Sequence, residues 1–87
     1  MYLLVVYDVK VDRVNRLFKF LRLYLSWVQN SVFEGEVSKS QFFEVCEGIK
    51  RIINCKEDSV LVYCFSDVRL VKRKVIGVER GDTNRLI

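Results

Sequence analysis

The chemistry open to this chain is limited first by a residue type that it lacks. None of its 87 residues is histidine, which excludes Ser–His and Cys–His catalysis and every histidine-containing zinc site. Catalysis would therefore depend on carboxylates, thiols, lysines or a bound metal ion. The three cysteines, at positions 46, 55 and 64, match no zinc spacing, and their odd number argues against a disulfide framework. We interpret them as structural thiols, with Cys46 in a helix and Cys64 in a strand, where small thiols are commonly buried.

Asp8 is the carboxylate whose position most favours a metal ion. It follows the apolar run Tyr2 to Tyr7, and strand alternation places it on the same side as Leu4 and Val6. One carboxylate holds Mg²⁺ poorly, because this ion is bound through one or two carboxylates together with water and phosphate oxygens. Two-fold symmetry would supply a second Asp8. From spacing alone two alternatives stay open, namely that Asp8 caps the following helix or pairs with a nearby arginine.

Positive charge is gathered in two stretches of the chain. The 15 basic and 11 acidic residues leave a net charge of +4, which favours an anionic partner, nucleic acid before membrane. The Gly-aromatic signature of common base-stacking RNA-binding domains is absent, so a reader of the phosphate backbone fits better than a reader of bases. The alternative is an ordinary solvated helix face. The candidate contacts are Arg13, Arg16, Lys19, Arg22, Arg73 and Lys74.

No segment indicates a membrane span or secretion. The longest apolar block, Leu3 to Tyr7, is far shorter than the roughly 18 residues of a spanning helix. The N-terminus carries no basic leader with a cleavage site. Together with the unpaired cysteines, this predicts a protein of the reducing cytoplasm with no membrane partner.

The periodicity of apolar residues predicts a small α+β domain. A capping box at Ser38 and Gln41 opens the second helix, Asp12 is expected to cap the first, and Asn30-Ser31 forms a turn. Two helices on one face of an antiparallel sheet make the ferredoxin-like βαββαβ plan. We expect an extra C-terminal strand, a domain over residues 1–79 and a tail over 80–87. The expected segments are a strand 1–8, a helix 12–25, strands 26–29 and 32–37, a helix 38–53, a strand 59–66 and a last strand 75–79.

The strands are apolar on both faces, which two helices alone do not cover. In the strand 59–66, Leu61 and Tyr63 point one way and Val60 and Val62 the other. A second copy packed sheet on sheet would cover the second face, giving a two-fold homodimer. The alternative is cover by the C-terminal segment of the same chain. We expect Val62 to be a second-face position, so that a lysine there would disrupt the dimer.

Two stretches resemble a known family. Tyr7-Asp8-Val9, followed by Arg13 and Arg16, and the stretch from Val28 to Glu36 (VQNSVFEGE) are similar to the Cas-two family of CRISPR-associated adaptation proteins over about residues 1–79. The resemblance implies a ferredoxin-like homodimer in which the last strand extends the partner's sheet. It also implies a partner, the CRISPR integrase (the Cas-one protein), with which the dimer acquires new spacers.

The resemblance further implies a metal-dependent endonuclease acting on RNA or double-stranded DNA, with Mg²⁺ as cofactor and Asp8 as its ligand. Tyr7, Ser31 and Phe33 match the motif stretches, but the resemblance assigns them no definite role, and the last residues, 81–87, match nothing in it. Three functions remain open. They are an adaptation scaffold with residual nuclease activity, a stand-alone toxin-like endoribonuclease, and a non-catalytic dimer that binds nucleic acid.

Overall fold

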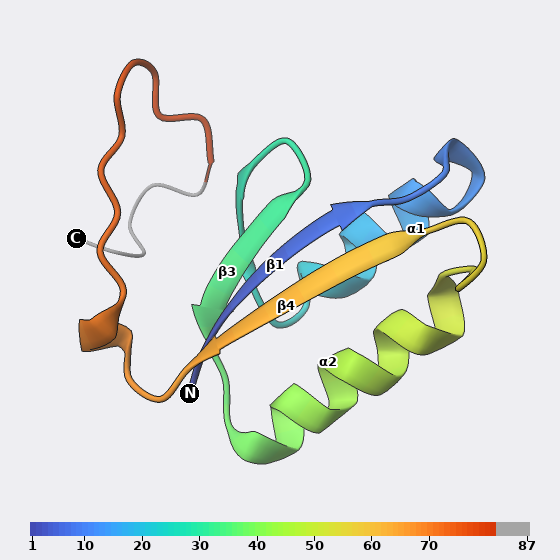
Figure 1. Ribbon diagram of the computed structural model, residues 1–87, viewed down its shortest axis with the longest axis horizontal. Coiled ribbons are helices and arrows are strands. Elements are labelled where there is room, and N and C mark those ends of the chain that lie inside the picture. The colour runs from blue at the N-terminus through green and yellow to red at the C-terminus, as the bar shows by residue number, and fades with distance from the viewer. Residues whose placement is uncertain (82–87) are drawn as a thin grey trace.

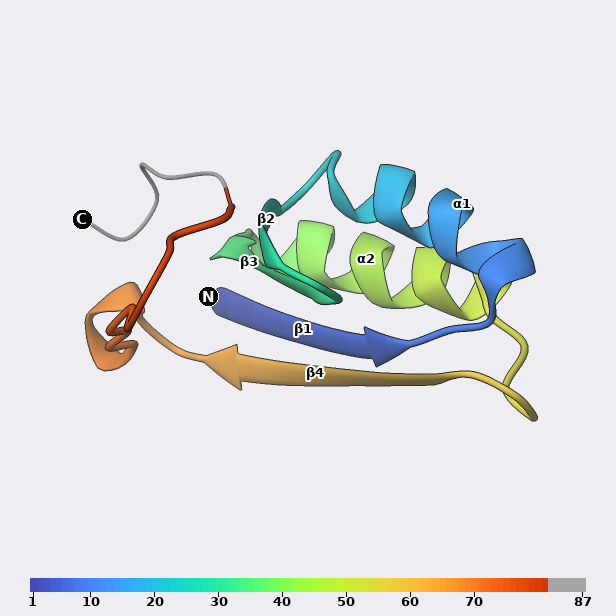
Figure 2. The same ribbon diagram turned by 90° about the horizontal axis from the view of Figure 1, so that it is seen from above.

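The computed structural model, which describes residues 1–81, has the ferredoxin-like order of elements (Figure 1). One antiparallel sheet has the strand order β2-β3-β1-β4. Both helices lie on the same side of this sheet (Figure 2), so the predicted α+β fold is confirmed. The elements are β1 (Tyr2–Asp8), α1 (Val11–Leu21), β2 (Ser26–Gln29), β3 (Val32–Glu36), α2 (Lys39–Ile52), β4 (Ser59–Phe65) and a 3₁₀ turn (Val68–Leu70).

The sequence predicts the N-terminal cap of α2 correctly but not that of α1. At α2 the predicted capping box is present: Gln41 N donates to the Ser38 hydroxyl, and Ser38 N donates to the Gln41 side chain. At α1 the prediction is wrong, because Lys10 occupies the N-cap and no side chain caps the helix. Asp12 lies instead in the first turn, where a carboxylate still interacts favourably with the helix dipole. The helix also ends at Leu21, four residues earlier than predicted.

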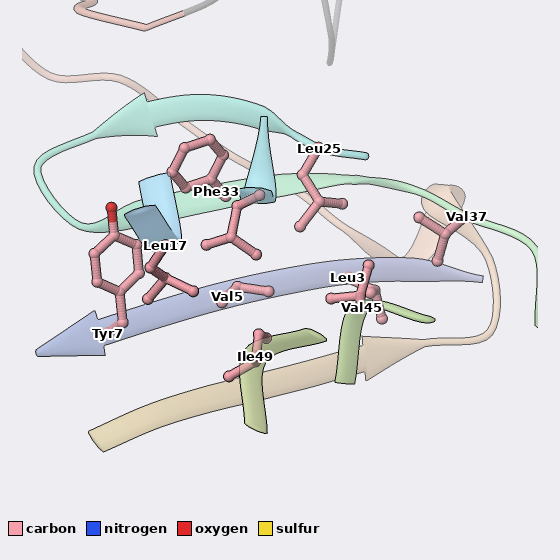
Figure 3. Packing of buried hydrophobic residues seen from close by; sticks show 10 residues of the cluster. Leu3, Val5, Tyr7, Leu17, Leu25, Phe33, Val37, Val45 and Ile49 are labelled. Atoms are coloured by element: carbon pink, nitrogen blue, oxygen red, sulfur yellow. The ribbon is translucent and has the colours of Figure 1, made fainter. Parts of the chain in front are cut away.

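The hydrophobic core lies between the helices and the inner face of the sheet (Figure 3). Leu3, Val5 and Phe33 are fully buried there. Val62 packs against this same core, so the prediction that it belongs to the second face is wrong. The strand is apolar on both sides, so its pattern does not reveal which side the helices cover.

The second face of the sheet is only partly covered by the chain itself. Leu61 and Tyr63, on the β4 side of this face, are 51% and 50% exposed. Next to them Leu4 and Val6 of β1 are half-buried. Residues 1–81 therefore leave the β1–β4 half of the face as an apolar surface beside Asp8.

The C-terminal segment does not form the predicted strand. Within the described chain, residues 71–80 pair with no strand, and Gly77 interrupts the stretch 75–79 with a φ of 100°, outside the extended range. The segment passes beyond the β2–β3 side of the sheet (Figure 1), and Gly81 lies against the Trp27 and Val28 carbonyls. A strand needs a neighbouring edge to pair with, and within residues 1–81 this segment pairs with neither edge strand of the sheet, β2 or β4. The proposed boundary at residue 79 stays a prediction, and most of the proposed tail, residues 82–87, lies outside the described residues.

Candidate metal and nucleic-acid site

Asp8 ends β1, where its backbone pairs with Ser59 at the start of β4. Its neighbour Tyr7 is buried under the helices, so Asp8 points to the opposite face and is exposed. Both alternatives for Asp8 fail within residues 1–81. It does not cap α1, and the arginine nearest in sequence, Arg13, pairs with other carboxylates. The Asp8 carboxylate therefore has no structural partner in the described chain.

Arg13 does not serve as a free cation. Its guanidinium donates to both oxygens of Asp58, from Nε at 2.6 Å and from Nη2 at 3.0 Å. It also reaches Glu57 at 2.9 Å and Asp12 at 3.3 Å. The hydrogen bonds from Arg13, with those from the amides of Asn54 and Lys10, hold the pKa of Asp58 well below its ordinary range. Predicted as a nucleic-acid contact, Arg13 instead joins two loops at one end of the sheet.

The motif residues Tyr7, Ser31 and Phe33 lie together in and beside the core. The side chains of Tyr7 and Ser31 share a hydrogen bond, and the Tyr7 amide donates to the Ser31 carbonyl at 3.1 Å. The ring of Phe33 stacks on Tyr7 and meets Phe18 edge-on. Burial raises the pKa of the Tyr7 phenol, and the hydrogen bond with Ser31 offsets this only in part. These contacts indicate that the motif builds the end of β1 that carries Asp8.

Two of the predicted cations on α1 face a groove between the helices. Arg16 and Lys19 are exposed and line a hollow of about 500 Å³ together with Arg51 of α2. Its apolar wall includes Phe20, whose ring packs so closely on Gly48 that a Cβ there would overlap it. The sequence did not single out Arg51 because it lies outside the two basic stretches, and only the packing of α2 beside α1 brings it to the groove. The three cations of the groove form no ion pair within residues 1–81, so the groove is a surface of positive charge.

The remaining predicted cations lie elsewhere. Arg22 stacks its guanidinium over the Phe18 ring at 5.7 Å. Arg73 pairs with Glu34 at 3.4 Å and with Glu79 at 3.7 Å, although the sequence stretch around it lacks acids. Lys74 is exposed in the C-terminal segment. The structure thus brings Arg16 and Lys19 together on the helical layer, while Asp8 points to the other side of the sheet.

Glu34 is a buried carboxyl on the second face that the sequence did not single out. It is 4% exposed, and burial raises its pKa above the ordinary 4.5, an effect that Arg73 opposes. Because Glu34 pairs in register with Leu4, Arg73 ties the C-terminal segment to the second face of β3. This contact bears out part of the alternative cover by the C-terminal segment.

A single copy of the chain offers few ligands for a metal ion. In the described part of the chain, no three His, Cys, Asp or Glu side chains gather in a metal-binding group. The cysteines are free. Cys64 is exposed rather than buried as predicted, because β4 is an edge strand of the sheet. No described helix has both the length and the apolar character needed to cross a bilayer.

Comparison with known proteins identifies the family. Residues 1–73 match the family model described as CRISPR associated protein Cas2. The chain belongs to the Cas2 family. The CRISPR-associated endoribonuclease Cas2 2 of Archaeoglobus fulgidus is 54% identical over 80 residues, which cover 92% of this chain and 87% of the relative. The CRISPR-associated endoribonuclease Cas2 of Thermococcus kodakarensis is 51% identical over 87 residues, the full length of both chains.

Solved structures agree with the family assignment. A crystal structure of cas2 superposes with a TM-score of 0.86 at 47% identity and covers 100% of this chain and 98% of that one. Streptococcus pyogenes Cas2, solved at pH 6.5, superposes with a TM-score of 0.71 at 31% identity over 86% of this chain and all of its own. The resemblance drawn from the motif stretches is therefore confirmed, and with it the ferredoxin-like Cas2 fold.

Proposed function

We propose that this Cas2-family chain is a homodimeric, magnesium-dependent endonuclease of a CRISPR system, with Asp8 as the residue that holds the metal. The observation that carries the proposal is the exposed Asp8 carboxylate at the end of a central strand, without a structural partner in residues 1–81. The names of the relatives, which call them endoribonucleases, support hydrolysis of phosphodiester bonds. RNA is therefore the first substrate to test, and double-stranded DNA the second.

The Asp8 carboxylate is a suitable ligand for magnesium, but a single chain supplies too few such ligands to hold the ion. Carboxylate oxygens are the protein ligands that Mg²⁺ prefers, and the ion keeps several waters and binds substrate phosphate. Asp8 lies on the face where Leu61 and Tyr63 are half exposed, and a second copy packed on that face would cover them. A two-fold axis near the end of β1 would then bring two Asp8 carboxylates to one site.

In this arrangement the residues divide the work. Asp8 would hold the metal on the second face of the sheet. The groove residues Arg16, Lys19 and Arg51, which lie on the helical layer away from Asp8, would bind a separate stretch of the phosphate backbone without reading sequence. Lys74 would add a contact from the C-terminal segment. Magnesium bound at Asp8 would polarise the scissile phosphodiester and lower the pKa of the attacking water. The chain itself has no imidazole to do so.

The proposed biological role is spacer acquisition, in which the dimer and the CRISPR integrase (the Cas-one protein) capture and integrate new DNA. Membership of the Cas2 family and the net charge of +4 support a partner made of nucleic acid. Affinity capture with the candidate integrase tests this role. Recovery of the integrase at a fixed stoichiometry supports it, and its absence, together with cleavage of RNA by the chain alone, favours a stand-alone endoribonuclease.

The experiment that tests the proposed activity compares wild type with Asp8→Asn on labelled RNA and duplex DNA, with Mg²⁺ and with a chelator. Asp8→Asn keeps the size and hydrogen-bonding capacity of the side chain but removes the charge that attracts the metal. We expect loss of magnesium-dependent cleavage with an unchanged melting temperature and much of the nucleic-acid affinity retained. Cleavage by Asp8→Asn at the wild-type rate contradicts the proposal. Binding by wild type without cleavage in any divalent metal favours the non-catalytic dimer.

A further inference from the structure

The Asp58 carboxylate and the Arg13 guanidinium are the two most heavily hydrogen-bonded side chains in the described part of the fold, with four hydrogen bonds each. Asp58 is the less expected of the two. Its side chain has no exposed surface, although it lies in the short connection between α2 and β4. It accepts four hydrogen bonds, two from the guanidinium of Arg13 and one each from the amides of Lys10 and Asn54, at 2.6 to 3.0 Å. Asp58 therefore links the β1–α1 loop, the first turn of α1 and the end of α2.

These contacts lie on both sides of Asp8. In the ladder between β1 and β4, Asp8 is the partner of Ser59, the residue directly after Asp58. Two residues after Asp8, the amide of Lys10 donates to Asp58 Oδ1 at 2.9 Å. The backbone that carries Asp8 is thus held by the ladder on one side and by the Asp58 carboxylate on the other. The two loops meet at the same end of the sheet (Figure 1).

The guanidinium of Arg13 has little capacity left for a ligand. An arginine has five N–H donors, and four of these donate to Asp12, Glu57 and Asp58. Three carboxylates also surround this one positive charge, so the local potential disfavours a phosphate. Bidentate arginine–carboxylate pairs of this kind fix geometry as well as charge.

We propose that Arg13 and Asp58 form a clamp that positions Asp8, and that Arg13 makes no contact with nucleic acid. Both are positioning residues, because they act on the reaction only through the backbone on either side of Asp8. The inference rests on the proposed function in one respect only, that Asp8 holds the metal. Misplacement of a reacting group by about 1 Å can cost roughly 100-fold in rate, so a loosened clamp lowers turnover while leaving binding of the nucleic acid intact.

The test uses the full chain with Asp58→Asn, which keeps the size of the side chain but removes its charge, and Arg13→Lys, which keeps the charge but removes the bidentate guanidinium. Glu57→Gln is the matched control, because Glu57 contacts the same guanidinium but is 53% exposed and does not reach the β1–α1 loop. Three quantities are measured: hydrogen exchange of the Lys10 amide by NMR, kcat with Mg²⁺, and the Kd and its salt dependence for RNA in a chelator. Dispersed NMR spectra establish that each variant is folded.

In Asp58→Asn and Arg13→Lys we expect faster exchange of the Lys10 amide and a kcat lowered about 10- to 100-fold. The Kd and the salt slope stay within twofold of wild type, and Glu57→Gln behaves as wild type throughout. A weaker Kd with a shallower salt slope in Arg13→Lys overturns the proposal, since it makes Arg13 a phosphate contact. Wild-type kcat in a folded Asp58→Asn with faster Lys10 exchange also overturns it.

A second experiment distinguishes an error in the proposed clamp from an error in the proposed function. Titration with Mn²⁺, followed by paramagnetic broadening of the Asp8 amide signal, reports on the metal site without any cleavage. If the clamp positions Asp8, Asp58→Asn requires about ten times more Mn²⁺ than wild type for the same broadening. Broadening at equal Mn²⁺ in both proteins overturns the clamp. Cleavage that survives in Asp8→Asn instead overturns the proposed function.

Discussion

Phe33 belongs to the stretch that carries the family resemblance, and the structure predicts that its role is to support the fold. Its side chain is fully buried, and its ring lies 6.3 Å from Tyr7 and 5.2 Å from Phe18, centroid to centroid. Phe33 therefore packs under the helices rather than on a surface that meets substrate. Its replacement should lower stability first and activity only through unfolding.

The expected loss follows from these contacts. Replacing a buried phenylalanine by alanine costs about 3–5 kcal/mol, against a total stability of about 4–13 kcal/mol for a domain of 87 residues. Phe33→Ala should therefore remove between about a quarter and all of the domain's stability. Phe33→Leu keeps most of the volume and loses two aromatic contacts worth about 0.5–1.5 kcal/mol each. For a domain of this size that lowers the Tm by roughly 5–20 °C.

Thermal unfolding followed by circular dichroism measures the change, and cleavage is assayed well below the Tm of each variant. Phe43→Leu is the matched control, because Phe43 is 66% exposed on α2, and its Tm should stay within about 2 °C of wild type. We expect Phe33→Leu to melt early yet cleave normally when folded. An unchanged Tm combined with lost cleavage refutes the structural role and makes Phe33 part of the functional surface.

Three further predictions concern association, nucleic acid and pH. Leu61 lies on the half-exposed second face, so Leu61→Lys should sediment as a monomer at micromolar concentration without lowering the protomer's stability. Val62 packs on the core, so Val62→Lys should unfold the chain. Arg16→Gln with Lys19→Gln should lower the slope of log K against log salt by about 0.9 per lost phosphate contact on duplex DNA. Hydrogen bonds lower the pKa of Asp58 in the folded chain. The stability that this carboxylate contributes is therefore present above its ordinary pKa of 3.8 and is lost as the pH falls below that value. In denaturant titrations at a series of pH values, Asp58→Asn should lose less stability on acidification than wild type.

Each of these predictions has an outcome that contradicts it. A stable dimer of Leu61→Lys would place the interface elsewhere, and a folded Val62→Lys would question the assignment of the inner face. If the Arg16 and Lys19 variant has the wild-type slope of log K against log salt, the groove between the helices is an ordinary solvated surface that binds no phosphate. If Asp58→Asn loses stability at low pH as steeply as wild type, other carboxylates govern acid unfolding.

The local signals in the sequence predicted the local structure. The capping box at Ser38 and the turn at Asn30, whose φ is 44°, depend on residues within a few positions of each other, so the chain itself specifies them. The first helix was placed less well, because an aspartate near a helix start can either cap the helix or lie within its first turn, as Asp12 does. The alternation of side chains along β1 correctly placed Asp8 on the face of the sheet opposite to that of Tyr7.

The features that the sequence did not predict depend on distant contacts. Arg13 and Asp58 lie 45 positions apart, so no spacing rule distinguishes this arginine from the exposed Arg16. Arg73 stands in a stretch without acids but meets Glu34 from the centre of the sheet. The predicted strand 75–79 pairs with neither edge of the sheet, β2 or β4, because strand pairing joins distant segments and apolar alternation alone does not specify the neighbour.

The central claim, that two Asp8 carboxylates build one magnesium site, is tested most directly by a dimer with a single intact copy. Wild type and Asp8→Asn carrying different affinity tags are unfolded together, refolded and purified through both tags. If the site is shared, the mixed dimer should have less than about a tenth of the magnesium-dependent cleavage of the wild-type dimer, because one carboxylate holds the ion poorly. Half of the wild-type activity in the mixed dimer would mean that each Asp8 works alone and would contradict the shared site.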